Sequence, residues 1–319
     1  MRYKRFGKTD MDVSVLTVGT WAIGGRNWGD IDLENSIDAI RAMLDNGVNF
    51  IDTAPVYGFG YSEEVVGKAI KGYEREKLYL STKFSLTWPE GPGTPIVKNA
   101  SYDNCMREID ESLRRMETDY IDLYIVHWPD IHVKAPAEET MRALCDLKKA
   151  GKIRYIGVSN YSEEQIGEIS AFGTVDALQP PYSMVNRVAE DLMIWAHERG
   201  IANMTYGSLG AGILTGTIRE LPDFPEKDTR LTFYDFFKEP KFSKIMELLK
   251  SLDVIAANHN VPVAQVAINW STQIPFVDTA LVGVRNAAEA VENCKATEWE
   301  LSADEIKSIN SAIDATVGK

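Results

Sequence analysis

Hydrophobic residues recur along the chain in short runs, and amphipathic stretches separate one run from the next. Most of the runs are continuous rather than alternating, which is typical of strands buried on both faces of a parallel sheet. The pattern therefore predicts eight strands. They occupy residues 13–19, 48–52, 78–82, 121–126, 153–159, 175–179, 201–206 and 278–283.

The stretches between these runs carry helix signals. Asp32 has the residue type of a helix cap, and Gly47 is suited to end the same helix. Ser62 is predicted to begin the next helix, with acidic residues in the first turn, where the helix dipole favours them. The other signals are the one-sided stripe of Met106, Ile109, Leu113 and Met116, the segment 138–150, and the capping boxes Ser162–Gln165 and Ser302–Glu305.

The order of these elements predicts the fold class. Because strands and helices alternate without a break, we predict that residues 1–319 form one domain, a (β/α)8 TIM barrel of the α/β class. The alternative is a doubly wound open sheet, but no GxGxxG motif follows the first strand. We also expect a β-hairpin within residues 2–16 and a long loop after strand 7, residues 207–240. Loops of that length are usually functional or mobile.

The composition narrows the class of partner. The 319 residues include 34 Lys and Arg against 47 Asp and Glu, a net charge of −13, which argues against a nucleic-acid or anionic-membrane partner. No apolar run approaches the roughly 20 residues of a membrane helix, and no signal peptide is evident, so we expect a cytoplasmic protein. The distant cysteines Cys105, Cys145 and Cys294 are expected to be buried free thiols, and we expect no metal site.

Candidate chemistry gathers where the predicted strands end. Active sites of (β/α)8 barrels lie at the carboxyl ends of the strands. Nearly every strand here ends in a polar or aromatic group, which is the convergence that an active site requires. In strand order the residues are Gly19, Thr20 and Trp21; Asp52, followed by Tyr57; Lys83; His127 and Trp128; Ser159 and Asn160; Gln179; Tyr206; and Gly283 with Arg285.

Asp52, Tyr57, Lys83 and His127 form a chemically coherent set. A tyrosine has an ordinary pKa near 10, too high for an efficient proton donor at neutral pH, and the ammonium of Lys83 would lower that pKa. A buried lysine needs a counter-charge, which Asp52 supplies. His127 can donate a hydrogen bond to a carbonyl oxygen or help to relay a proton. Together they predict a site that polarises a carbonyl group and protonates the resulting alkoxide.

Each of the four also has a plain structural interpretation. Asp52 could cap a turn, and Tyr57 could be a surface aromatic of the loop. Lysines are solvated by default, and a single histidine is more often structural than catalytic. The joint position of the four on strands 2, 3 and 4 favours catalysis. The tryptophans that follow strands 1, 3 and 4 could wall an apolar substrate pocket; they are Trp21, Trp28, Trp88 and Trp128.

Seven segments, in this order, resemble the aldo-keto reductase superfamily over almost the whole chain. IDTAPVYGFGYSEEVVGKAI resembles the family signature around the catalytic Asp and Tyr, KFS the Lys segment, and DLYIVHWPD the His segment. GKIRYIGVSN, ALQPPYS, YGSLGAGILTG and VGVRNAAEAVENC resemble the successive cofactor-side segments. The subgroup that the chain resembles is the bacterial, typically NADP-using branch that includes inositol- and sugar-linked reductases and potassium-channel β-subunit relatives.

The resemblance implies direct hydride transfer from NAD(P)H to an aldehyde or ketone, without a Rossmann motif. Tyr57 would be the general acid, Lys83 and Asp52 its tuning pair, and His127 the orienting or relay group. The implied substrate-binding residues are Trp21, Tyr57, Trp88, His127 and Trp128. The implied cofactor-binding residues are Gly19, Thr20, Trp21 and Asp52; Ser159, Asn160 and Gln179 at the nicotinamide carboxamide; Tyr206 stacked on the nicotinamide ring; Gly207, Ser208, Leu209 and Gly210 at the pyrophosphate; and Gly283, Arg285, Glu289 and Asn293 at the adenosine end.

Three positions depart from the family pattern. Gly207 and Ser208 replace the usual pair after the stacking tyrosine, which removes one side-chain donor for phosphate. Glu289 stands where the family often has Arg or Gln, and its carboxylate would repel a 2′-phosphate, whereas Arg285 is well suited to hold one. We therefore expect NADP(H) as the cofactor, with NAD(H) close behind.

Three functions remain in view. The first is reduction of an aldehyde, ketone or sugar-derived carbonyl compound by NAD(P)H. The second is the same site used in the oxidative direction, on a sugar or polyol with NAD, which Glu289 favours. The third is a cofactor-sensing regulatory subunit, as in the channel-associated relatives. The partner in the first two is a small molecule, and the sequence identifies neither the substrate nor the oligomeric state.

Overall fold

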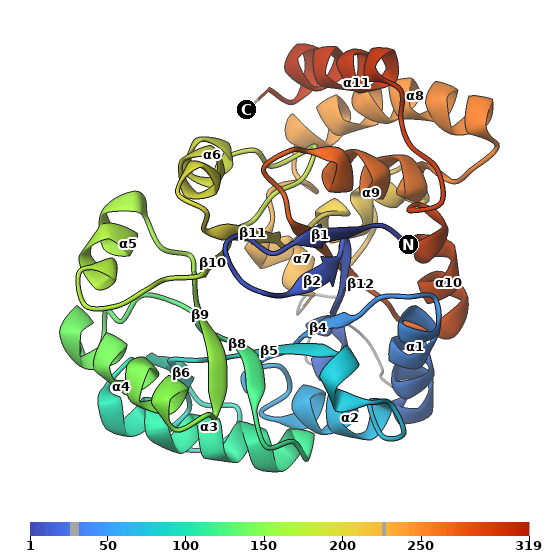
Figure 1. The fold of residues 1–319 in the computed structure, drawn as a ribbon. Helices are drawn as coiled ribbons and strands as arrows, with labels where there is room; N and C mark the ends of the chain where they lie inside the picture. Colours follow the sequence, from blue (N-terminus) through green and yellow to red (C-terminus); the bar gives the residue numbers. More distant parts are fainter. Residues whose placement is uncertain (26–31, 225–227, 319) are drawn as a thin grey trace.

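The computed structural model describes residues 1–25, 32–224 and 228–318. Eight parallel strands close into a barrel (Figure 1), in the order β10-β11-β12-β3-β4-β5-β8-β9. The barrel strands are β3 (Leu16–Gly19), β4 (Phe50–Asp52), β5 (Tyr79–Phe84), β8 (Ile121–Val126), β9 (Ile153–Ser159), β10 (Ala177–Gln179), β11 (Ala202–Thr205) and β12 (Thr279–Gly283). Each of these strands overlaps one of the eight predicted runs. The TIM-barrel prediction is confirmed and the open sheet is wrong, because β12 pairs with β3 and places Gly283 opposite Gly19.

Helices surround this barrel (Figure 1). They are α1 (Leu33–Asp45), α2 (Tyr61–Ala69), α3 (Tyr102–Met116), α4 (Ala137–Lys149), α5 (Glu163–Ser170), α6 (Glu190–Glu198), α7 (Thr229–Phe233), α8 (Lys241–His259), α9 (Val263–Gln273), α10 (Ala287–Lys295) and α11 (Ala303–Thr316), with 3-10 turns η1 (Ala22–Gly24), η2 (Arg75–Lys77) and η3 (Gly210–Thr215). Asp32 caps α1 through the backbone N–H of Asn35, and both predicted capping boxes are present.

The start of α2 differs from the prediction by one residue. The helix begins at Tyr61 with Gly60 as its cap, in the left-handed region at φ 97°, so Ser62 is not the capping residue. The Ser62 hydroxyl lies inside the protein instead and donates to the hydroxyl of Thr20 at 2.7 Å. It also accepts from the Thr53 hydroxyl at 3.0 Å. Ser62 therefore ties the start of α2 to the ends of β3 and β4.

The predicted N-terminal hairpin closes one end of the barrel. Strand β1 (Tyr3–Arg5) pairs antiparallel with β2 (Asp12–Ser14), and Figure 1 shows the pair lying across the barrel end that faces the viewer. Phe6 and Met11 between them are fully buried, and the Phe6 ring meets the barrel residue Phe50 edge-on at 5.6 Å. The carboxyl ends of the strands lie at the opposite end, which is the end left open for a site.

Two long connections at that open end contain regular structure of their own. Residues 85–101 include the small hairpin β6 (Leu86–Thr87) and β7 (Val97–Lys98). Residues 207–240 include η3 and α7. Neither is a plain loop, because the hairpin β6–β7, η3 and α7 each place side chains beside the barrel mouth.

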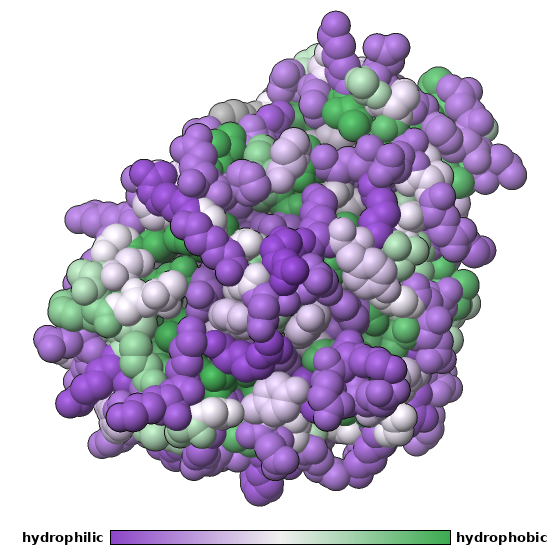
Figure 2. Space-filling model, viewed as in Figure 1, coloured by the Kyte–Doolittle hydropathy of each residue, from purple (hydrophilic) through white to green (hydrophobic). Residues whose placement is uncertain are grey.

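The surface at the hairpin end is mostly hydrophilic (Figure 2), and two of the three cysteines are buried. Figure 2 shows hydrophilic residues over most of the hairpin end, with apolar residues scattered among them. Cys105 and Cys294 are buried as predicted, whereas Cys145 is only partly buried. Within the residues that the structure describes, no helix is long and apolar enough to cross a membrane.

Candidate active site

A cavity of about 820 Å³ opens at the carboxyl ends of the barrel strands. It extends from the polar floor of the barrel to the start of α10. Most of the predicted site residues line it: Gly19, Thr20, Trp21, Asp52, Tyr57, His127, Trp128, Ser159, Asn160, Gln179, Tyr206, Gly207, Ser208, Leu209, Gly283, Arg285, Glu289 and Asn293. The barrel thus brings together residues that are far apart in the sequence, from Gly19 to Asn293.

Three predicted residues lie elsewhere. Lys83 is fully buried beneath the cavity floor and reaches it through its partners. The structure places Trp88 outside the cavity wall, where its ring packs edge-on against Phe59 at 5.0 Å. Gly210 also lies off the wall, as the first residue of η3. Trp28 is outside the described residues.

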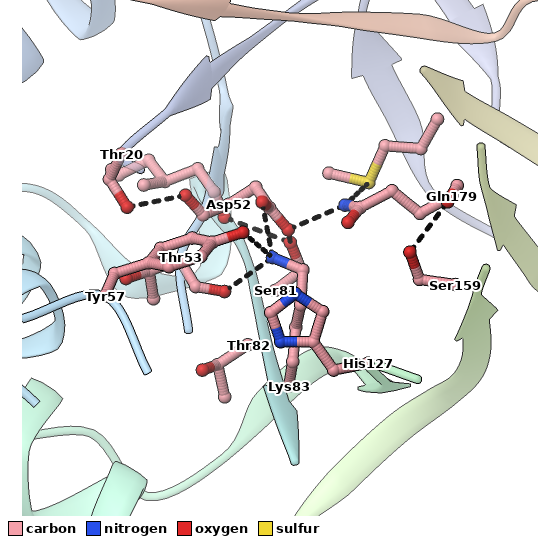
Figure 3. A network of polar contacts seen from close by, with 12 residues as sticks. Thr20, Asp52, Thr53, Tyr57, Ser81, Thr82, Lys83, His127, Ser159 and Gln179 are labelled. Carbon is pink, nitrogen blue, oxygen red and sulfur yellow. Dashed lines mark hydrogen bonds and ion pairs between the residues drawn. The ribbon is translucent and has the colours of Figure 1, made fainter. Parts of the chain in front are cut away.

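The Lys83 ammonium joins two of the predicted catalytic residues, Asp52 and Tyr57 (Figure 3). It donates to Asp52 Oδ2 at 2.7 Å, to the Thr53 carbonyl at 2.9 Å and to the Tyr57 hydroxyl at 3.3 Å. An ammonium has three N–H donors and no acceptor, so these contacts use all three. The Tyr57 oxygen must accept this hydrogen bond, which leaves its own O–H free to donate into the cavity.

Asp52 is held on both carboxylate oxygens. Oδ2 accepts from Lys83, while Oδ1 accepts from the Ser81 hydroxyl at 2.7 Å and from Gln179 Nε2 at 2.9 Å. Asp52 and Lys83 are both almost wholly buried, and such a pair is tolerated only when hydrogen bonds satisfy the remaining positions. The turn-cap interpretation of Asp52 is therefore wrong. Because Gln179 gives its amide nitrogen to Asp52, its amide oxygen is the atom that it can offer to a ligand.

Glycines bring Tyr57 over the lysine. Gly58 lies at φ 69°, in the left-handed region that favours glycine. A Cβ atom at Gly58 would lie 2.4 Å from the carbonyl oxygen of Gly24, and one at Gly24 would lie 2.6 Å from the Tyr57 carbonyl carbon. The Tyr57 loop and the turn η1 therefore cross backbone against backbone. This close approach explains the glycine-rich sequence that follows the tyrosine.

The pKa of Tyr57 does not follow the sequence prediction. Burial and the Asp52 carboxylate raise the pKa of Tyr57 well above its ordinary value, so the predicted lowering by Lys83 is wrong for this structure. The sequence prediction considered only the Lys83 ammonium, which favours the phenolate. The loss of water around the phenol disfavours the phenolate and is the larger effect. The phenol accordingly stays protonated across the physiological range. Burial also lowers the pKa of Lys83, against the opposing carboxylate of Asp52.

His127 completes the floor beside Tyr57. It follows β8, its backbone N–H donates to the Phe84 carbonyl at 3.0 Å, and its ring meets the Tyr57 ring edge-on at 5.8 Å. Burial, together with the charge of Lys83, lowers the pKa of His127 well below its ordinary value. The imidazole is therefore neutral at pH 7 and carries one N–H donor.

A network of side chains holds the opposite wall of the cavity. The Tyr206 hydroxyl donates to Asn160 Oδ1 at 3.0 Å, and Asn160 Nδ2 donates to the His127 carbonyl at 2.9 Å. The Ser159 hydroxyl donates to the Gln179 carbonyl at 2.8 Å. Tyr206, predicted to stack on a planar ring, is thereby fixed in orientation and lines the cavity.

Aromatic side chains wall the mouth. The Trp21 ring lies 6.3 Å from Tyr57 on one side and meets Phe233 edge-on at 5.3 Å on the other. Phe233 and its neighbour Tyr234 also line the cavity from the end of α7, and the sequence pattern did not predict either. The length of the loop after strand 7 was the available signal, but no periodic pattern showed which of its aromatic residues turn inward. The Trp128 ring lies 4.3 Å below the Lys98 ammonium.

The far end of the cavity is charged. Arg285 Nη2 lies 2.5 Å from Glu289 Oε1, and Arg285 Nε lies 3.1 Å from the same oxygen. The Arg285 side chain is 78% exposed, so this is a surface ion pair. Nearer the middle of the cavity, the Ser208 hydroxyl is buried with no hydrogen-bond partner among the described residues. Such a hydroxyl is suited to a bound polar group.

The whole chain has counterparts among known proteins. The family model described as "Aldo/keto reductase family" matches residues 15–314. This chain belongs to the aldo/keto reductase family. It is 39% identical to the aldo-keto reductase YhdN of Bacillus subtilis over 99% of this chain and 95% of that protein. It is 33% identical to the NADH-specific methylglyoxal reductase of Escherichia coli, over 93% of each.

Solved structures of related proteins have the same fold. The glycerol dehydrogenase AKR11B4 of Gluconobacter oxydans superposes with a TM-score of 0.89 at 32% identity, over 99% of this chain and 96% of that one. As an aldo/keto reductase, the protein is an oxidoreductase of a family that uses nicotinamide cofactors. The residues present fit such a cofactor, because three suitable groups lie along one cavity. They are the oriented ring of Tyr206, the buried Ser208 hydroxyl that has no partner among the described residues, and the charged pair Arg285–Glu289 at the far end.

Proposed function

We propose that the protein reduces an aldehyde or ketone to an alcohol with NAD(P)H, and that Tyr57 supplies the proton. One observation carries this proposal: Lys83 donates to the Tyr57 oxygen at 3.3 Å, so the phenol proton is directed into the cavity next to His127. The raised pKa of Tyr57 keeps that proton in place until a strong base forms beside it. An alkoxide is such a base.

The bound cofactor would supply a hydride to the carbonyl carbon and leave oxidised. As the carbon–oxygen π electrons move onto oxygen, that oxygen takes the Tyr57 proton and an alcohol results. The tyrosinate left behind lies against the Lys83 ammonium, whose charge Asp52 supports from the other side. Stabilisation of a charge as it develops is the largest contribution that such fixed groups make.

His127 would hold the carbonyl oxygen in place. A neutral imidazole can donate one hydrogen bond to that oxygen without competing for the proton. Because burial, together with the charge of Lys83, keeps His127 neutral, we assign it the role of orienting the substrate rather than of carrying the proton itself. The substrate would lie between Tyr57 and His127, against Trp21 and Trp128.

The cofactor residues remain those predicted from the sequence, except that Gly210 lies outside the cavity wall. Ser159, Asn160 and Gln179 would hold the carboxamide, and Tyr206 would stack on the nicotinamide ring. Ser208 would serve the pyrophosphate with its buried hydroxyl as well as its backbone. The adenosine end of the cofactor would be bound by Gly283, Arg285, Glu289 and Asn293.

We propose NADP(H) as the cofactor, with a small margin over NAD(H). Arg285 must exchange the Glu289 carboxylate for a 2′-phosphate, and an exposed ion pair is cheap to exchange, at about 0–1 kcal/mol. Glu289 nevertheless stays near the phosphate and repels it. The same pair supports the alternative function, NAD-dependent oxidation of a polyol or sugar alcohol, which the name of the related glycerol dehydrogenase also suggests.

A substrate panel with both cofactors tests the proposal. It should include small dicarbonyl compounds, because one relative is named for methylglyoxal, together with aromatic aldehydes, aldoses and, in reverse, glycerol. The account predicts reduction of at least one carbonyl class that disappears in Tyr57→Phe. Oxidation of polyols with NAD but no reduction of any carbonyl compound would support the alternative.

A further inference from the structure

A buried ion pair lies behind the candidate active site, between β5 and the helices. Glu63 in the first turn of α2 is fully buried, and its Oε2 pairs with Arg115 Nε at 2.6 Å, at the end of α3. Its other oxygen, Oε1, accepts from the Thr82 hydroxyl at 2.6 Å. The carboxylate is therefore committed on both oxygens. The catalytic steps proposed above use none of these three residues.

The Thr82 contact bears on Lys83. The two residues are consecutive on β5, so their side chains project from opposite faces of the strand. Glu63 holds the Thr82 hydroxyl on the helix side, and a hydrogen bond there restrains the rotation of the strand at Lys83. That rotation matters because the Lys83 ammonium meets three acceptors at once, within 2.7–3.3 Å.

The Arg115 contact bears on Tyr57. Arg115 passes beside Gly60, where a Cβ atom would lie 2.7 Å from Arg115 Cδ. Gly60 closes the loop that carries Tyr57, since its N–H donates to the Pro55 carbonyl at 2.6 Å. The arginine side chain therefore packs directly on the backbone of this loop. Glu63 in turn holds the arginine.

We propose that Glu63 is a positioning residue of the active site, which directs Lys83 through Thr82 and supports the Tyr57 loop through Arg115. The inference rests on the proposed carbonyl reduction, because it concerns the alignment of the same proton donor. Three titratable groups face Lys83 from the barrel: Asp52 from β4, Tyr57 from the following loop and His127 from the end of β8. The Glu63 carboxylate lies on the other face of β5, beside Thr82, and its charge acts on Lys83 across the strand. Burial lowers the pKa of Lys83, and the Asp52 and Glu63 carboxylates oppose that shift.

Two variants separate the charge of Glu63 from its hydrogen bond. Glu63→Gln removes the charge and keeps a side chain of the same shape. Thr82→Val removes the hydroxyl and leaves both charges paired, while Thr82→Ser restores the hydroxyl. Titration of the Lys83 13Cε signal by NMR, assigned from its loss in Lys83→Met, reports on the lysine without requiring turnover.

We expect the Lys83 titration midpoint to move about one unit to lower pH in Glu63→Gln. We also expect kcat to fall at least about tenfold in both Glu63→Gln and Thr82→Val, with Thr82→Ser within about twofold of the wild type. If Glu63→Gln does not fold, the comparison of Thr82→Val with Thr82→Ser decides the question. An unchanged midpoint and an unchanged kcat in Glu63→Gln, or equal rates for Thr82→Val and Thr82→Ser, would overturn the proposal.

Asp122→Asn is a matched control. Asp122 is also a fully buried carboxylate, pairs with Arg75 at 2.7 Å and accepts from the backbone of Leu80 on β5. It should lower thermal stability without moving the Lys83 midpoint, and an equal movement would mean that any buried carboxylate near β5 acts alike. If the wild type reduces no carbonyl compound, the proposed function fails, whereas the Lys83 midpoint in Glu63→Gln still decides the role of Glu63.

Discussion

The Lys83 ammonium donates a hydrogen bond to the Tyr57 oxygen at 3.3 Å, and this contact fixes the direction of the phenol proton. Because the lysine cannot accept, the tyrosine must accept from it and donate elsewhere. In the proposed reaction, the contact would also provide a positive charge for the tyrosinate that remains after proton transfer. Asp52 lies 2.7 Å from the Lys83 ammonium and supports that charge, and both side chains are almost wholly buried.

Replacing the lysine should therefore slow the reaction more than it weakens binding. In Lys83→Met we expect kcat to fall by about 10²–10⁴-fold, because the tyrosinate loses its counter-charge. The cofactor dissociation constant, measured by quenching of tryptophan fluorescence, should stay within about threefold. A loss of cofactor binding in parallel with kcat would show that the lysine serves the cofactor rather than Tyr57.

The pKa of His127 predicts a dependence of stability on pH. In the folded protein this pKa is well below its ordinary value of about 6.5, so below that pH the unfolded chain takes up a proton that the folded chain does not. The free energy of unfolding should therefore decrease as the pH falls below about 6.5. Denaturant titrations between pH 5 and pH 8 measure it. In His127→Leu the decrease should be smaller, and an equal decrease would contradict the assignment.

The Arg285–Glu289 ion pair at the far end of the cavity predicts how the protein discriminates between NADP(H) and NAD(H). Glu289→Gln removes the carboxylate that occupies Arg285 and repels a 2′-phosphate. The dissociation constant for NADP(H) should fall by about fivefold, while that for NAD(H) should not change. Fluorescence titrations at low ionic strength measure both, because salt screens an exposed pair. Equal changes for the two cofactors would place Glu289 away from the phosphate.

The crossing of the Tyr57 loop and η1 predicts sensitivity to a single methyl group. Gly58→Ala combines a left-handed backbone with a Cβ atom 2.4 Å from the Gly24 carbonyl oxygen. We expect a loss of at least about 2 kcal/mol in the free energy of unfolding. Gly72→Ala is the control, since Gly72 also has a positive φ but no atom lies within 4 Å of its Cβ position. If both variants lose the same stability, the contact with Gly24 contributes nothing.

The sequence predicted most of the barrel because the evidence for it is local. Continuous apolar runs and caps such as Asp32 are visible in a few adjacent residues. The same approach predicted Asp52, Lys83 and His127 as a group, because strand ends of a barrel converge whatever the intervening loops do. The structure then supplied the contacts that join them.

What the sequence did not predict depends on tertiary packing. Trp88 turns away from the cavity to pack on Phe59, and Phe233 turns toward it to meet Trp21, although neither choice is visible in the local pattern. Likewise, the sign of the pKa shift at Tyr57 depends on how completely water is excluded from the phenol. Burial of that kind is decided by residues from several distant segments.

The central claim is that Tyr57 is the proton donor, and single-turnover kinetics of Tyr57→Phe test it most directly. With the cofactor bound in advance and a substrate that the wild type reduces, stopped-flow absorbance follows hydride transfer itself. The account predicts a rate about 10³-fold lower than that of the wild type, with the cofactor dissociation constant within about threefold. Hydride transfer at the wild-type rate in Tyr57→Phe would contradict the account.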